Sequence, residues 1–454
     1  MERSYKMDKA TTLLISRLTM QNAGNEALSK QFLKYFAANG EGEDVRALDR
    51  YPRYFETLSM KQLGSCPVEA FDKLAKDLML RFNDKHAVPL PKAAEGLVKL
   101  DETARELTGF LRKIKRKVAW RKRFSSLLLI EKSQLLSAVT GCATSGLVVW
   151  NPAGEIHPTG SPDQVMRLLL LLRIAQLSGN KTAVVNHSLE IVDDRLRQLI
   201  AHVYKNLDYV GVRDAKSVEV ALELGVSETR IYESPDLVFL ASREDRAQQG
   251  KLPKGTVALA INGLEALSGS DEWANFMKGL EDLKRPIVHV SNAVNHDRDF
   301  SNYLAGLADK SSVVDHQPGY IELRSFYQDC AVLISSRLHA SILALCEGTP
   351  VISIEPSVFK LTAIFEQMNY PIRTTRLQEI GWSEKILATV RAIINDERPE
   401  LVTEGDRALR HQVNLVEQAF KPLFALMPRS AVALSRSSKA ELDRRAPSSA
   451  DSVS

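Results

Sequence analysis

Arg337 and His339 lie two residues apart, where the chain passes from a predicted strand to a predicted helix. The apolar run 331–334 before them is typical of a buried parallel strand, and 341–346 after them has helical spacing. Open α/β sheets bind ligands at the carboxyl ends of their strands. A guanidinium can hold carboxylate or phosphate oxygens through two parallel hydrogen bonds. The pattern therefore predicts a site for a small polyanion.

A third cation, Lys360, follows the next predicted strand, 351–354, after a break at Pro356. Because neighbouring parallel strands end at the same edge of a sheet, we expect Lys360 to approach the same crevice and add a point charge. Each of these side chains alone would more often be a solvated or helix-start residue. Their convergence on adjacent strand ends favours a binding site.

The size and charge of the chain limit the kinds of protein that it can be. With 454 residues, 44% of them hydrophobic, it can form two domains rather than one. The balance of 60 basic and 56 acidic residues gives a net charge of +4, too small to require a nucleic-acid partner. The first 18 residues lack the long apolar core of a signal peptide, and the strongest apolar run, 168–172, is followed directly by Arg173. We expect a cytoplasmic protein.

The four cysteines have no paired metal-binding spacing and are interpreted as reduced thiols. No cluster of His, Cys or carboxylate residues has metal-ligand spacing either. The sequence therefore predicts a reaction that uses no metal and no other cofactor. The cysteines are Cys66, Cys142, Cys330 and Cys346.

Polar residues follow several other predicted strands. Gly24, in a loop after the strand 11–18, could let backbone N–H groups approach an anion or a sugar, although a simple βα turn explains it as well. Arg213 adds a further cation at a strand end. His187 is interpreted either as a turn histidine or as a ligand contact, and Asp236 as a residue that caps its own turn.

A polar, charged segment at 242–254 divides the chain. We predict an N-terminal domain over 1–245, with a helical basic insert at about 50–124, and a C-terminal domain over 251–427. The remainder, 428–454, is rich in Ser, Arg and Ala and is expected to be disordered.

The insert carries a dense basic segment, 112–123, with Trp120 and Phe124 in or beside it. Such a segment can lie on an anionic membrane surface, and this would place the protein peripherally at the inner face of the membrane. A solvated charged face is the simpler interpretation. Nucleic-acid binding is disfavoured because no recognition motif accompanies the basic residues.

Four motifs together resemble the polysaccharide pyruvyltransferase family. They are N-x-G-N-E-A-L at 22–28, V-R-D-x-x-S at 212–217, P-D-x-V-F at 235–239, and S-R-L-H-A-S-I-L-A at 336–344 with Lys360 downstream. The R-L-H segment with its following lysine is the most specific of them. The loop at 151–157, N-P-A-G-E-I-H, departs from the more glycine-rich loop of the family.

The resemblance implies two Rossmann-like domains in a glycosyltransferase B-type arrangement, with the active site in the interdomain cleft. It implies transfer of pyruvate from phosphoenolpyruvate to a pair of hydroxyls on a sugar or a lipid-linked oligosaccharide, as a ketal, in exopolysaccharide or cell-surface glycan biosynthesis. We expect His339 to act as general acid, or else to hydrogen-bond the donor phosphate. The expected donor-binding residues are Arg213, Arg337, Leu338 and Lys360, and the expected acceptor-binding residues are Asn22, Gly24, Glu155 and His187.

Two alternatives stay open. A nucleotide-sugar-dependent glycosyltransferase of the same architecture would need a carboxylate for the ribose, and Glu355 is the only candidate at the expected place. A catalytically silent scaffold of a polysaccharide-assembly complex is the other, suggested by the atypical loop at 151–157.

Overall fold

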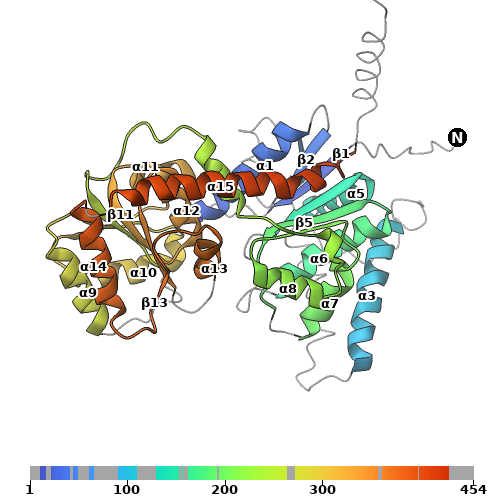
Figure 1. Cartoon of the computed structure of the whole chain (residues 1–454). Helices are drawn as coiled ribbons and strands as arrows, with labels where there is room; N and C mark the ends of the chain where they lie inside the picture. Colours follow the sequence, from blue (N-terminus) through green and yellow to red (C-terminus); the bar gives the residue numbers. More distant parts are fainter. Residues whose placement is uncertain are drawn as a thin grey trace, which may run out of the picture.

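A computed structural model describes most of the chain as two sheets covered by helices (Figure 1). Among the residues of interest, Glu155 and the basic segment 112–123 lie outside the described residues, as do Cys66 and all residues beyond 428. The described residues are 11–16, 22–40, 44–49, 61–65, 90–109, 129–152, 156, 162–191, 194–262, 271–355, 360–396 and 398–428.

The N-terminal sheet has seven strands in the order β3-β2-β1-β4-β5-β6-β7, and every recorded pairing is parallel. β4 and β6 are buried along their whole length, as expected of a parallel sheet with both faces covered. The strands are β1 (Thr11–Ser16), β2 (Asp44–Asp49), β3 (Lys61–Ser65), β4 (Leu147–Asn151), β5 (Lys181–His187), β6 (Tyr209–Val212) and β7 (Ile231–Glu233).

Alternate residues of this sheet face two different cores. Leu13 and Val148 point into a core shared with the helices of the insert side, whereas Leu14 and Val149 point into a core that continues into the C-terminal sheet. The helical elements of this half are α1 (Ala23–Asn39), α3 (Leu90–Gly109), α5 (Leu129–Thr144), α6 (Pro162–Leu177), α7 (Asp194–Tyr204), α8 (Ala215–Glu223), η2 (Glu228–Arg230) and η3 (Leu237–Arg243).

The C-terminal sheet has six strands in the order β10-β9-β8-β11-β12-β13, again with parallel pairings. Its strands are β8 (Thr256–Ala260), β9 (Ile287–His289), β10 (Ser311–Val313), β11 (Cys330–Ser335), β12 (Val351–Glu355) and β13 (Thr375–Arg376). Its helices are α9 (Asp271–Glu281), α10 (Val294–Ala305), α11 (Tyr320–Tyr327), α12 (Leu338–Cys346), α13 (Lys360–Gln367) and α14 (Trp382–Ile394). Each half is thus a Rossmann-like domain, as the sequence predicts.

The last helix, α15 (Glu400–Phe424), lies across both domains (Figure 1). Near its start, Gly405 lies against Leu345 of the C-terminal domain. Near its end, Phe420 and Phe424 pack on the ring of Phe36 in α1, with ring centroids 6.3 and 5.2 Å apart. The amphipathic pattern at 412–420 predicts a last helix, and the structure extends this helix by about three turns into the C-terminal domain.

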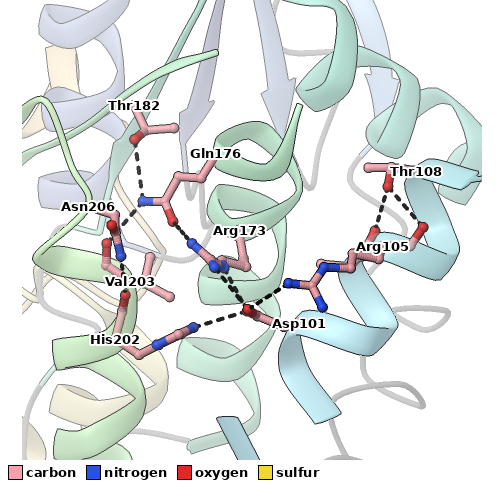
Figure 2. Close-up of polar contacts among 10 residues, drawn as sticks. Asp101, Arg105, Thr108, Arg173, Gln176, Thr182, His202, Val203 and Asn206 are labelled. Atoms are coloured by element: carbon pink, nitrogen blue, oxygen red, sulfur yellow. Dashed lines mark hydrogen bonds and ion pairs between the residues drawn. The ribbon is translucent and has the colours of Figure 1, made fainter. Parts of the chain in front are cut away.

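The insert contributes a long helix, α3, that is tied to the N-terminal domain by Asp101 (Figure 2). Its carboxylate accepts two hydrogen bonds from Arg173 of α6, at 2.6 and 2.9 Å, and lies 3.0 Å from Nε2 of His202 in α7. Within the segment predicted as irregular and helical, the structure also places β3 at the edge of the sheet. The sequence of β3, K-Q-L-G-S, lacks the alternation by which an edge strand could have been found.

Candidate functional site at the facing strand ends

The site forms where the carboxyl ends of the two sheets face each other. Arg213 directly follows β6 of the N-terminal sheet, whereas Arg337 and His339 follow β11 of the C-terminal sheet at the start of α12. Arg213 and His339 both reach the carboxylate of Asp236, which precedes η3. The structure therefore brings together residues from both domains that sequence reasoning placed at separate strand ends.

Asp236 is a completely buried carboxylate with three partners. Its Oδ2 lies 2.6 Å from Nη1 of Arg213 and 3.4 Å from Nε2 of His339, and its Oδ1 accepts a 2.9 Å hydrogen bond from the Val238 amide. Burial alone would raise the pKa of Asp236, but His339, Arg213 and the Val238 amide together hold it well below its usual range. The carboxylate is therefore charged at neutral pH.

Arg337 is also paired with a buried carboxylate, that of Asp297. Its Nη2 donates a hydrogen bond to Asp297, which is 1% exposed. Asp297 also accepts the backbone amides of Asn292 and Ala293, at 3.2 and 3.1 Å, and so lies fixed at the start of α10. This arrangement orients the guanidinium while leaving 16% of the arginine side chain exposed.

Arg213, Arg337 and His339 each have a buried side-chain nitrogen that makes no hydrogen bond to any described residue. Nε of Arg213, Nε of Arg337 and Nε2 of His339 have no hydrogen-bond partner within the described part of the chain. At 3.4 Å, the contact of His339 with Asp236 is an ion-pair distance rather than a hydrogen bond. Buried polar groups are nearly always hydrogen-bonded, so these nitrogens make the three residues candidates for binding a ligand with acceptor oxygens.

The start of α1 packs directly on the His339 imidazole. A Cβ added to Gly24 would lie 2.5 Å from Nδ1 of His339, far inside van der Waals contact. Near Gly24, Asn22 caps α1, because its Oδ1 accepts a hydrogen bond from the Asn25 amide at 3.0 Å. The same oxygen accepts a hydrogen bond from Nδ2 of Asn292 at 3.3 Å. The structure therefore gives Asn22 and Gly24, predicted as acceptor contacts, roles in joining the domains around His339.

The structure places His187 in the core rather than at a ligand surface. Its Nδ1 lies 3.0 Å from the Gly211 carbonyl and its Nε2 lies 3.1 Å from the Tyr204 hydroxyl, and the residue is 0% exposed. Burial, and then the charge of Arg213, lower the pKa of His187 to about 3, so the ring is neutral. Because both ring nitrogens are occupied, His187 supports β6, the strand that carries Arg213, instead of contacting an acceptor.

Three further residues complete the account of the predicted site. Leu338 opens α12 and packs, half-buried, against the core. Lys360 begins α13 beyond the end of β12, and its side chain lies outside the described part of the structure. Glu355 accepts hydrogen bonds from the amides of Leu361 and Thr362, at 2.9 and 3.3 Å, and burial raises its pKa. Its oxygens are thus used at the start of α13, which disfavours a ribose-binding role.

Sequence reasoning missed the two carboxylates that hold the cations. Asp236 lies in the P-D-x-V-F motif and does cap its turn, but its ion-pair partners lie 23 and 103 positions away. Asp297 lies 40 positions from Arg337. Local patterns carry no signal for such pairs. The P-D-x-V-F motif was the one available indication that Asp236 does more than cap.

The fold of this chain is similar to those of solved structures with the glycosyltransferase B-type arrangement. A putative UDP-N-acetylglucosamine 2-epimerase from Listeria monocytogenes has 10% identity, covers 91% of this chain and 97% of its own, and gives a TM-score of 0.53. A glycosyltransferase from Rickettsia africae ESF-5 has 11% identity over 97% and 100% of the two chains, with a TM-score of 0.50. S. aureus MnaA with UDP has 12% identity over 98% and 100%, with a TM-score of 0.50.

A family model described as polysaccharide pyruvyl transferase matches residues 22–357. The match covers most of the chain and includes Arg213, Asp236, Arg337 and His339. The chain therefore belongs to the polysaccharide pyruvyl transferase family. No curated protein matches it.

Two further observations concern the described residues. No group of three or more His, Cys, Asp or Glu side chains in that part of the chain is arranged to hold a metal ion. No helix there combines the length and apolarity needed to cross a membrane.

Proposed function

We propose that the protein transfers pyruvate from phosphoenolpyruvate to two hydroxyls of a sugar, forming a ketal. The observation that supports this donor is the set of three buried, unpaired nitrogens on Arg213, Arg337 and His339. Phosphoenolpyruvate carries a phosphate and a carboxylate, and two guanidinium groups and an imidazole can serve both. Lys360, which begins α13 at the neighbouring strand end, is the proposed fourth donor contact.

The proposed reaction moves one proton onto the donor and releases phosphate. His339 gives a proton to the methylene carbon, which becomes a methyl group and leaves positive character on the central carbon. One sugar hydroxyl adds to that carbon and gives up its proton to a base, for which Glu155 is our candidate. The bond from the central carbon to the phosphate oxygen then breaks. Inorganic phosphate leaves, and the second hydroxyl adds to the same carbon and loses its proton.

The cations supply binding and charge neutralisation in this scheme. Arg213 and Arg337 are oriented by Asp236 and Asp297 before the donor arrives, so little reorganisation is needed when the phosphate accumulates charge. Donors that are fixed in advance stabilise a developing charge more strongly than mobile ones. Because the same groups would hold the phosphate product, we expect excess inorganic phosphate to inhibit the reaction.

A transfer assay tests the proposal. The protein is incubated with phosphoenolpyruvate labelled at its central carbon and with a panel of p-nitrophenyl glycosides that carry adjacent or bridging hydroxyl pairs. We expect a new ketal carbon signal in the NMR spectrum together with equimolar inorganic phosphate, and both should be lost in Arg337→Ala. Transfer of a sugar from UDP-N-acetylglucosamine, with no ketal from any acceptor, would contradict the proposal and support the nucleotide-sugar alternative.

A further inference from the structure

Asp236 connects two cations that come from different domains. Arg213 ends a strand of the N-terminal sheet, and His339 lies in the first turn of α12 in the C-terminal domain. Both approach the same carboxylate oxygen, Oδ2, at 2.6 and 3.4 Å. The position of this one oxygen therefore sets where both cationic groups lie relative to each other.

The backbone fixes the carboxylate independently of the cations. Asn186, at the end of β5, accepts the Leu237 amide at 2.8 Å, and Asp236 itself accepts the Val238 amide at 2.9 Å. Just before it, the Ser234 amide donates to the Val212 carbonyl at 2.8 Å. Because hydrogen bonds hold the turn at three points, the Asp236 carboxylate has a fixed position. The side chains of Arg213 and His339 orient toward it.

Among the described residues, few charged groups have recorded contacts near the pair. Arg337, two residues before His339, is paired with Asp297 of α10. The helix α1 contributes Gly24, which has no charge, and α13 contributes Gln367, whose amide donates to the Arg213 carbonyl at 3.3 Å. Among the described residues with recorded contacts here, Asp236 is thus the carboxylate that faces both Arg213 and His339.

We propose that Asp236 is the positioning residue of the donor site: it orients Arg213 and stabilises the protonated imidazole of His339 beside the bound donor. This inference rests on the proposed function, because it assigns the cations to phosphoenolpyruvate. A carboxylate near an imidazole favours the charged form of the ring. The same carboxylate repels an incoming anion. The two effects act in opposite directions on donor binding and can be separated by pH.

The isosteric variant Asp236→Asn should change the pH dependence of donor binding. Near pH 6, where an imidazole is largely protonated without help, the variant should bind phosphoenolpyruvate as tightly as wild type or up to about tenfold tighter, because a repelling charge is gone. Near pH 8.5 it should bind about tenfold more weakly, because the carboxylate that favours the charged form of an adjacent imidazole is gone. A residue with only a folding role would weaken binding equally at every pH.

Isothermal titration of phosphoenolpyruvate between about pH 6 and pH 8.5 provides the measurement. Asp214→Asn is the matched control. Asp214 is a buried aspartate next to Arg213. Its carboxylate accepts hydrogen bonds from the hydroxyls of Ser188 and Ser217 and from the Ser217 amide. Its variant should lower the melting temperature without changing the pH at which binding falls. Asp236→Glu retains the charge but moves it, and should keep the wild-type pH midpoint with about tenfold weaker binding.

The outcomes separate this inference from the proposed function. Binding by wild type with parallel pH curves for wild type and Asp236→Asn would overturn the positioning role and leave the donor assignment intact. Absence of binding by folded wild type would overturn both. If Asp236→Asn does not fold, the Asp236→Glu titration decides, and wild-type affinity in that variant would overturn the inference.

Discussion

At the scale of single residues, the proposed donor site depends on two buried carboxylates and on the absence of a side chain at Gly24. Asp236 and Asp297 each hold one arginine, so the cations are ordered by the protein itself. Gly24 provides the space in which the imidazole of His339 lies against α1. The sequence indicated the arginines and the histidine, whereas the carboxylates that orient them were found only in the structure.

Gly24→Ala tests the close packing of α1 on the imidazole. Replacing a helical glycine by alanine normally stabilises a protein by about 0.5–1 kcal/mol. Here the added methyl would lie 2.5 Å from Nδ1 of His339, so the ring or the helix must shift. We expect a lower melting temperature and at least about tenfold weaker binding of phosphoenolpyruvate, measured by thermal unfolding and titration.

Gly405→Ala in α15 is the control for this prediction. A Cβ at Gly405 would meet Leu345 and Tyr370 at an ordinary 3.8 Å, so this variant should be neutral or stabilising and should bind the donor normally. If Gly24→Ala behaves like Gly405→Ala in both measurements, the close contact between α1 and His339 does not exist in solution.

At the scale of elements, the strands with a clear hydrophobic pattern could be predicted and the edge elements could not. The runs that became β4, β6, β11 and β12 are apolar and bounded by Gly, Pro or polar residues, which is the signal of buried parallel strands. β3 contains only one strongly apolar residue. No helix or strand is predicted from the sequence in the region of α9. Which strand ends face each other depends on contacts between distant segments, which no local pattern carries.

The helix α3 offers a prediction at this scale, because Asp101 ties it to α6 and α7 (Figure 2). Burial raises the pKa of Asp101, but the hydrogen bonds and charges of Arg173 and His202 lower it overall. A carboxyl whose pKa is lowered by folding stabilises the protein above its unfolded pKa, and this stabilisation is lost as pH falls through the folded value. Asp101→Asn should therefore cost about 1–2 kcal/mol in the free energy of unfolding at neutral pH.

Urea unfolding at pH 7 and at acidic pH measures this effect. The difference between wild type and Asp101→Asn should be largest at pH 7 and should shrink as the pH falls from about 4 toward 3. Glu102→Gln on the same helix is the control, since Glu102 forms an exposed pair with Lys99 and should cost less than about 0.5 kcal/mol. Equal losses in the two variants, or a loss that does not change with pH, would show that Asp101 does not anchor α3.

At the scale of the whole molecule, the two Rossmann-like domains share one core. α1 and η3 pack against the C-terminal domain, and α15 returns from that domain to cover Phe36 (Figure 1). The polar contacts at the site follow the same division, with Arg213 and Asp236 on one side and His339 on the other. A donor bound at the proposed site must therefore be held by both domains.

Titration of phosphoenolpyruvate into matched lysine variants tests this requirement most directly. Arg213→Lys and Arg337→Lys keep the charge but remove the fork that binds two oxygens, one variant in each domain. Arg298→Lys, an exposed arginine in α10 bonded to the Asp315 carbonyl, is the control. We predict saturable binding by wild type and by the control, and at least about tenfold weaker binding by each of the two site variants. Loss of affinity in only one of them would contradict a donor shared between the domains, and absence of binding by folded wild type would contradict the donor itself.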